Sequence, residues 1–219
     1  IQAAPPARDV PCAESGWGFI DEDLFTRYIQ RTAGLVSADS PRDLRLVLTS
    51  MHGVGADVCE TVLAQAGFSE VFPVAQQREP DPDFPTIPFP NPEEAGALDM
   101  AMALARDKHA DLIVANDPDA DRCAAAIPDP DAPGGWRQLS GDETGVLLGY
   151  YQCQDRRGSS ATVARSLVSG ELLDRVAAAA GVTPMVSLTG FKWIARTPGL
   201  IFGYEEAVSY THLRAHATL

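Results

Sequence analysis

One short segment of the chain has acidic residues at alternate positions, and an arginine follows them: Asp117, Asp119, Asp121 and Arg122. The segment comes directly after a predicted strand at 112–115, and ligand sites in open α/β sheets gather at the carboxyl ends of strands. Pro118 disfavours a helix here, and residues two apart in an extended loop point to the same side. Three converging carboxylates require a positive charge, and oxygen ligands favour a hard cation. The segment therefore predicts a Mg²⁺ site.

Two other chemistries use alternating aspartates, and the spacing argues against both. A calcium EF-hand loop that began at Asp117 would need glycine in place of Arg122 and glutamate in place of Pro128. A haloacid-dehalogenase-type phosphotransferase has the pattern D-x-D-x-T or D-x-D-x-V, whereas Asp121 occupies the fifth place here. An acidic surface turn without a ligand is the remaining alternative, and it is more typical of a bare D-x-D than of three acids after a buried strand.

The residues around this segment alternate between strand and helix patterns. Predicted strands cover residues 44–49, 71–75, 112–115, 161–167 and 182–188, and predicted helices lie near 58–66, 91–108, 140–148 and 171–180. Such alternation is typical of helices packed on mainly parallel sheets. We therefore expect an α/β fold of two consecutive α/β domains, with mixed, mainly parallel sheets covered by helices, that meet near residue 130.

Turn and capping residues add detail to this pattern. The prolines of residues 80–92 predict a long, stiff loop, of a kind that is often functional. Asn91, followed by Pro92 and Glu94, predicts a helix that starts there and runs to about residue 108. Ser140 with Glu143 three residues later forms a second predicted capping box. His52 and its neighbouring glycines are interpreted as turn residues that serve backbone geometry rather than phosphate contact.

Several segments occur in the order in which α-D-phosphohexomutases carry them. They are T-S-M-H-G-V-G at 49–55, D-F-P-T at 83–86, P-N-P-E-E at 90–94, D-P-D-A-D-R at 117–122, S-G-D-E-T-G at 140–145, T-G-F-K-W at 189–193 and F-G-Y-E-E-A at 202–207. The chain resembles this family over roughly residues 21–208, and an ordered set of motifs is more specific than any one of them. The E-E-A form and the H-G-V-G turn resemble the phosphoglucomutase and phosphopentomutase branch more than alginate-type phosphomannomutases.

The resemblance implies a role for each site residue. The three aspartates would hold Mg²⁺, and Arg122 would support the phosphoryl group or the sugar near the metal. Lys192, in the T-G-F-K segment, would lie at the substrate. Glu205 and Glu206 would accept hydrogen bonds from two adjacent sugar hydroxyls. Ala207 stands where many members carry serine, which leaves the choice between a hexose and a pentose open.

The same resemblance implies a phosphosugar mutase, an intramolecular phosphotransferase. It would interconvert the 1-phosphate and 6-phosphate of glucose or mannose through a phosphoserine and a sugar bisphosphate. A phosphopentomutase is the alternative within the enzyme class, and a non-catalytic sugar-phosphate-binding module is the alternative outside it. The family's T-A-S-H-N-P segment does not occur in the sequence. We therefore expect domains 1 and 4 of the same enzyme to be missing partners, and this chain alone to be inactive.

Domain limits and surroundings follow from the same reasoning. We expect a linker at 1–20, domain 2 with the metal loop at 21–133, an incomplete domain 3 with the sugar loop at 134–208 and a non-native tail at 209–219. The formal net charge of −13 argues against nucleic acid and anionic membranes as partners. No apolar stretch reaches the length of a bilayer-spanning helix. Four scattered cysteines indicate reduced thiols, as in a cytoplasmic protein.

Overall fold

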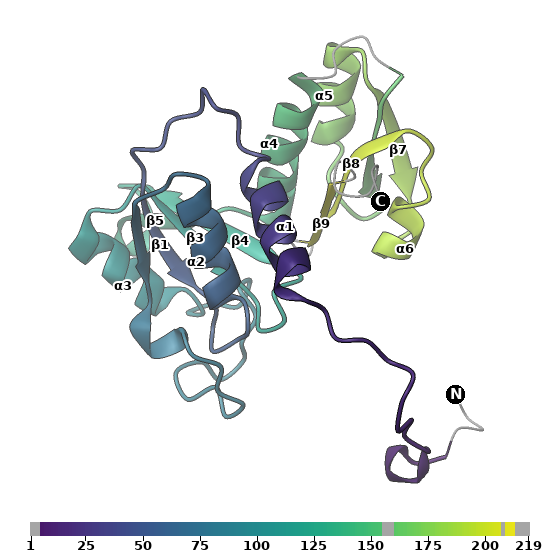
Figure 1. The fold of residues 1–219 in the computed structure, drawn as a ribbon. Coiled ribbons are helices and arrows are strands. Elements are labelled where there is room, and N and C mark those ends of the chain that lie inside the picture. The colour runs from purple at the N-terminus through teal and green to yellow at the C-terminus, as the bar shows by residue number, and fades with distance from the viewer. Residues whose placement is uncertain (1–4, 155–159, 207–208, 213–219) are drawn as a thin grey trace.

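The computed structural model describes residues 5–154 and 160–206, and of residues 209–212 only the backbone. The described chain folds into two α/β domains, each built on its own sheet, and the expected fold class is confirmed (Figure 1). A short 3-10 helix, η1 (Ala7–Asp9), is the only regular element before helix α1 (Glu22–Ala33) in the described part. Among the described residues, no helix combines the length and the apolar character needed to cross a bilayer.

The first sheet has five strands in the order β2-β1-β3-β4-β5. The strands are β1 (Arg45–Thr49), β2 (Glu70–Pro73), β3 (Leu112–Asn116), β4 (Cys123–Pro128) and β5 (Trp136–Gln138). β2, β1 and β3 run parallel, whereas β3, β4 and β5 pair antiparallel. The sheet is therefore mixed, and the tight β3–β4 connection carries the three aspartates.

Three helices accompany this sheet: α1, α2 (Ala56–Gln65) and α3 (Asp99–Lys108). Val47 and Ile113, paired across β1 and β3, are fully buried against Ala101 and Ala105 of α3. Small alanines on this helix face allow α3 to lie close to the sheet. α1 packs on α2 rather than on the sheet itself.

The second sheet has the order β7-β6-β8-β9. Its strands are β6 (Thr162–Ser166), β7 (Thr183–Ser187), β8 (Leu200–Glu205) and β9 (Ser209–His212). Helices α4 (Gly141–Gln154) and α5 (Leu172–Ala180) cover one face, and the short α6 (Phe191–Ile194) covers the other. Neighbouring residues Val163 and Ala164 accordingly belong to opposite cores.

Most predicted elements are present, but one helix start is wrong. The helix expected from Asn91 begins at Asp99, and the preceding residues form turns that contain Gly96 at φ 83°. Asn91 does not cap α3, because its Oδ1 atom accepts hydrogen bonds from the Glu93 backbone at 3.3 Å and from Arg122 Nη1 at 3.1 Å. A contact across the chain has therefore overridden a local capping signal.

The second capping box is confirmed. Ser140 N donates to Glu143 Oε2 at 2.8 Å, and Glu143 N donates to Ser140 Oγ at 3.1 Å. α4 continues to Gln154, beyond the expected end at 148. Six of the described α-helices and strands have no counterpart among the predicted ones: α1, β4, β5, α6, β8 and β9.

The structure also bears on the expected domain limits. β5 continues the first sheet past residue 133, where we placed the boundary. The backbone of residues 209–212, within the expected tail, pairs with β8 as β9, and residues 213–219 lie outside the described residues. That the tail is non-native stays a prediction.

Candidate active site

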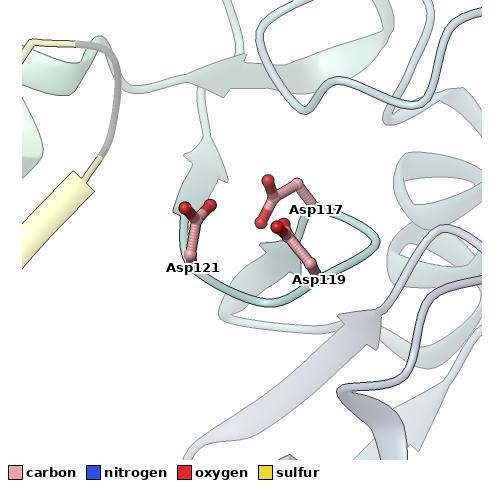
Figure 2. A group of neighbouring side chains, drawn as sticks. All are labelled: Asp117, Asp119 and Asp121. Atoms are coloured by element: carbon pink, nitrogen blue, oxygen red, sulfur yellow. The ribbon is translucent and has the colours of Figure 1, made fainter. Parts of the chain in front are cut away.

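The loop between β3 and β4 brings the three aspartates together. Asp117, Asp119 and Asp121 each offer a carboxylate oxygen, and these oxygens all lie within 4.8 Å of one another. Figure 2 shows the three carboxylates directed to the same side of the loop. Asp117 is buried, whereas the other two face solvent. One cation could contact all three groups, and the set of oxygen ligands suits Mg²⁺.

Arg122 fixes the buried aspartate. Its backbone N–H donates to Asp117 Oδ1 at 2.9 Å, and its Nε donates to Asp117 Oδ2 at 2.8 Å. Burial alone would raise the pKa of Asp117, but the hydrogen bonds and the charge of Arg122 outweigh it and hold the pKa below its usual value. Asp117 is therefore a carboxylate that is ionised and held in place by the protein.

Asp121 shows the opposite tendency. Partial loss of hydration, followed by the negative charges of Asp117 and Asp119, raises the pKa of Asp121. Within the described residues, Arg122 is the one cation that forms an ion pair with any of these three acids, and its Nε lies 3.7 Å from Asp121 Oδ1. The excess negative charge fits a site that takes a cation.

The turn after β1 contacts the backbone of the aspartate loop at Pro118. Val54 N donates to the carbonyl of Pro118 at 2.9 Å. A Cβ atom on Gly53 would lie 2.3 Å from both the Cα and the carbonyl oxygen of Pro118, so no larger residue fits at position 53. The glycine thus serves backbone packing, as the sequence analysis expected.

His52, next to that glycine, connects the turn to the proline-rich loop. It is buried, and its Nε2 lies 2.8 Å from Thr86 Oγ1. Its backbone donates to Gln77 O at 2.9 Å and accepts from Asp81 N at 3.0 Å. His52 is a structural contact of the loop at 80–92, which the sequence alone did not indicate.

The second acidic pair lies at the end of β8. Glu206 Oε2 accepts from Ser166 Oγ at 3.1 Å and from Ser169 Oγ at 3.0 Å, and Glu206 N donates to Ser169 Oγ at 3.1 Å. Both serines are buried. A Cβ on Gly141 would lie 1.7 Å from Glu206 O, so the first turn of α4 presses directly on this residue. The carboxylate of Glu206 is therefore fixed through one oxygen.

Glu205 is held by a different segment. Its Oε1 accepts a hydrogen bond from Gly190 N, which precedes α6. That helix carries Lys192, an exposed side chain with its ammonium 5.9 Å from the Trp193 ring. Glu205 thus links the T-G-F-K segment to the end of β8.

Two hollows adjoin these groups. A cleft of about 510 Å³ lies between the domains, lined by Glu93, Gln138, Leu139, Ser140, Gly141, Asp142, Glu143 and Glu206. A smaller pocket of about 350 Å³ is lined by Phe89, Pro90, Asn91, Asp117, Pro118, Asp119 and Arg122. The structure thus places the aspartates with Arg122 at one hollow and Glu206 at the other. Lys192 and Glu205 line neither of these two.

Sequence reasoning missed several residues of this region. Ser166 and Ser169 gave no signal, because their role depends on contacts 37 and 40 residues away in the chain. Asn91 and Glu93 belong to a motif that was noticed but was interpreted as a helix start. The proximity of that motif to the aspartate loop could have been inferred only from the expected sheet order.

The chain matches two neighbouring family models. Residues 24–133 match the model described as phosphoglucomutase/phosphomannomutase, alpha/beta/alpha domain II, and residues 140–218 match that of domain III. Together the two matches cover most of the chain, and each covers one of the two sheets except for β5.

Relatives with similar sequences carry several mutase names. A probable phosphomannomutase of Haemophilus influenzae is 43% identical over 208 residues, which are 95% of this chain and 42% of that protein. A phosphopentomutase of Mus musculus is 38% identical, with 86% of this chain and 32% of that protein covered. The chain thus spans less than half the length of these relatives.

Solved structures agree on the fold. A phosphoglucomutase/phosphomannomutase family protein of Burkholderia thailandensis superposes with a TM-score of 0.73 at 19% identity, over 86% of this chain and 39% of that one. A putative phosphomannomutase of Thermus thermophilus gives a TM-score of 0.70 at 24% identity, over 87% and 43%.

Proposed function

Because the chain belongs to the phosphoglucomutase/phosphomannomutase family, we propose that it forms the metal-binding and sugar-binding parts of a phosphosugar mutase. The observation that carries this proposal is the convergence of three carboxylate oxygens within 4.8 Å at the end of β3. The interdomain cleft beside Glu206 provides room for a sugar phosphate.

The reaction is the movement of a phosphoryl group between two hydroxyls of one sugar. In the family mechanism a phosphoserine transfers its phosphoryl group to one sugar hydroxyl, and the resulting sugar bisphosphate transfers its other phosphoryl group back to the serine. Such transfer needs mainly positioning and neutralisation of charge. Asp117, Asp119 and Asp121 would hold Mg²⁺, which supplies positive charge to the transferring group when it is bound.

The other residues bind and orient the substrate. Arg122 donates from Nε to Asp117 and from Nη1 to Asn91, and it lines the pocket beside the aspartates, where its charge is available to a phosphate. Glu205 and Glu206 accept hydrogen bonds from sugar hydroxyls. Lys192 adds a positive charge for a phosphate near the T-G-F-K segment. A ring held by its hydroxyls can then be bound in either of two orientations, as a reaction through a bisphosphate requires.

The substrate is the 1-phosphate and 6-phosphate pair of glucose or mannose. The phosphopentomutase of Mus musculus and a phosphoribomutase of Saccharomyces cerevisiae, 36% identical, favour ribose or deoxyribose phosphates as a second candidate. Ala207, the position that raised this question, lies outside the described residues. In a complete enzyme that carries this loop, we expect glucose 1-phosphate and ribose 1-phosphate to compete for one site, and hexose turnover that saturating ribose 1-phosphate left unchanged would contradict a shared site.

Calorimetric titration with Mg²⁺ tests the metal site. We expect weak binding to the parent chain, because no phosphate completes the ligand set, and none to an Asp119→Asn variant. Asp131→Asn is the matched control, an exposed acid in the loop between β4 and β5. Equal binding by the parent and the Asp119→Asn variant would contradict the assignment.

A coupled assay tests whether the chain is sufficient by itself. With glucose 1-phosphate as substrate and glucose 1,6-bisphosphate as activator, we expect no sustained formation of glucose 6-phosphate, because the phosphoserine segment of the family is not in the chain. Turnover that Asp119→Asn abolishes would show that these residues hold a complete active site.

A further inference from the structure

The P-N-P-E segment at 90–93 is bonded to strand β5 and to the aspartate loop. Pro92 is fully buried, and its carbonyl accepts a hydrogen bond from Gln138 Nε2 at 2.7 Å. Asn91 Oδ1 accepts from both Arg122 Nη1 and the Glu93 backbone. The backbone at Glu93 is thus tied to β5 on one side and to the arginine of the aspartate loop on the other.

Glu93 differs from the other acids that line the interdomain cleft. Asp142 accepts from Gly170 N at 2.7 Å and from Tyr204 Oη at 2.8 Å. Glu143 is occupied by Ser140 and Arg137, and Glu206 by two serines. Within the described part of the chain, no protein donor reaches the carboxylate of Glu93. It is the cleft-lining carboxylate with both oxygens available to a ligand.

Glu93 lines the interdomain cleft together with Glu206, and Asn91, two residues earlier, lines the pocket of the aspartates. Burial raises the pKa of Glu93, while the charge of Arg122 lowers it and the charge of Glu206 raises it. The charges of Arg122 in the aspartate loop and of Glu206 at the end of β8 therefore both act on Glu93. A sugar phosphate that extended from the aspartate loop to the end of β8 would pass this carboxylate.

From these three observations we propose that Glu93 is a further substrate-binding residue, which accepts a hydrogen bond from a ring hydroxyl of the sugar phosphate on the cleft wall opposite Glu206. This inference rests on the proposed function, since it assumes that the cleft takes a sugar phosphate. It adds a residue from the first domain to a sugar contact otherwise made by the second.

The charge of Glu93 makes the inference testable by sign. A carboxylate that merely stood near an anionic ligand would repel it, so its neutralisation would leave binding unchanged or strengthen it. A carboxylate that accepts a charge-assisted hydrogen bond strengthens binding, so its neutralisation weakens it. Proximity without contact thus predicts an unchanged or higher affinity for Glu93→Gln, whereas a direct hydrogen bond predicts a lower one.

Titrations followed by ¹⁵N-¹H NMR compare the parent chain with Glu93→Gln and with the matched control Glu94→Gln, an exposed neighbour that does not line the cleft. The probes are glucose 1-phosphate and inorganic phosphate, both with Mg²⁺. We expect Glu93→Gln to lower the affinity for glucose 1-phosphate about tenfold, as the loss of one charge-assisted hydrogen bond would. The affinity for inorganic phosphate should be unchanged or higher. Glu94→Gln should match the parent with both probes.

The outcomes separate the inference from the function on which it rests. Parent-like or tighter binding of glucose 1-phosphate by Glu93→Gln would overturn the inference and leave the proposed function intact. Equal weakening of both probes would also overturn it, because inorganic phosphate has no ring hydroxyl. No binding of glucose 1-phosphate by the parent would overturn both. Glu93→Asp, which keeps the charge but shortens the reach, should also weaken only the sugar phosphate, and its spectrum guards against misfolding.

Discussion

The aspartate loop, which carries Asp117, Asp119 and Asp121, and the segment with Glu205 and Glu206 at the end of β8, called the glutamate loop below, are both acidic. They are held in place in different ways. The aspartate loop is mainly self-contained, because Arg122 secures Asp117 five residues away and one neighbouring turn supports it. The glutamate loop depends on Ser166 and Ser169, which lie 37 to 40 residues earlier in the chain, and on the first turn of α4. The local contact between Arg122 and Asp117 joins residues of one sequence segment, whereas the serine partners of Glu206 cannot be recognised from the residues next to it.

The largest expected losses of stability come from two glycines, one packed against each loop. Gly141→Ala would place a Cβ 1.7 Å from Glu206 O, and Gly53→Ala would place one 2.3 Å from the Pro118 backbone. Each should cost about 3 kcal/mol of unfolding free energy, at the upper end of overpacking effects. Urea unfolding measures the loss.

The comparison is sharpened by ligand binding in the same glycine variants. Gly53→Ala should abolish Mg²⁺ binding. Gly141→Ala should leave Mg²⁺ binding unchanged and weaken the binding of glucose 1-phosphate. Gly18→Ala is the control, since its Cβ would meet nothing within 4 Å. If both variants lost Mg²⁺ binding equally, the two loops would not be independent.

A smaller effect should separate two aspartates of one loop. Asp117→Asn removes a buried charge that two Arg122 bonds satisfy, and should cost about 2 kcal/mol of unfolding free energy. Asp119→Asn changes an exposed side chain and should leave stability within about 0.5 kcal/mol of the parent. Both should lose Mg²⁺ binding in calorimetry. Equal stability of the two variants would show that Arg122 does not depend on Asp117.

Ser169→Ala should lower the free energy of unfolding by about 1 kcal/mol, because it removes hydrogen bonds to the carboxylate and to the backbone of Glu206. Glucose 1-phosphate should bind more weakly in an NMR titration, and Mg²⁺ should bind as in the parent. Ser187→Ala, at the end of the edge strand β7, is the control. Unchanged sugar binding would mean that Glu206 keeps its position without this serine.

The smallest effect concerns the cap of α4. The Ser140 backbone, followed by Arg137, lowers the pKa of Glu143 from its ordinary 4.5. A depressed folded-state pKa contributes stability that is present above the unfolded value and is lost as pH falls through the folded value. Glu143→Gln should therefore cost about 0.5 kcal/mol at pH 7, a value suited to an exposed pair, and nothing at pH 2. Urea unfolding of both proteins at the two pH values checks this, and a constant difference would contradict it.

The sequence predicted the fold class, most helices and strands, and the convergence of the three aspartates. Alternate acids after a buried strand, and a capping box at Ser140, are signals carried by adjacent residues. The helix start at Asn91 was wrong, because its side chain accepts a hydrogen bond from Arg122 of the loop between β3 and β4. β4 and β5 were missed since half of Cys123–Pro128 is alanine and Trp136–Gln138 is only three residues long. The roles of Ser166 and Ser169 required the pairing of β6 with β8.

The connection between the last strand of the first sheet, β5, and the first helix of the second domain, α4, is very short, and this limits how the cleft can change shape. β5 ends at Gln138 and α4 begins at Gly141. Leu139 N is bonded to Ala125 O at 2.9 Å, and Arg137 pairs with Glu143 at 2.8 Å across the connection. The two walls are thus joined by a stiff hinge, whose rotation would have to break or stretch these bonds. Opening of the cleft would accordingly be a small twist about one axis rather than a free separation of two tethered bodies.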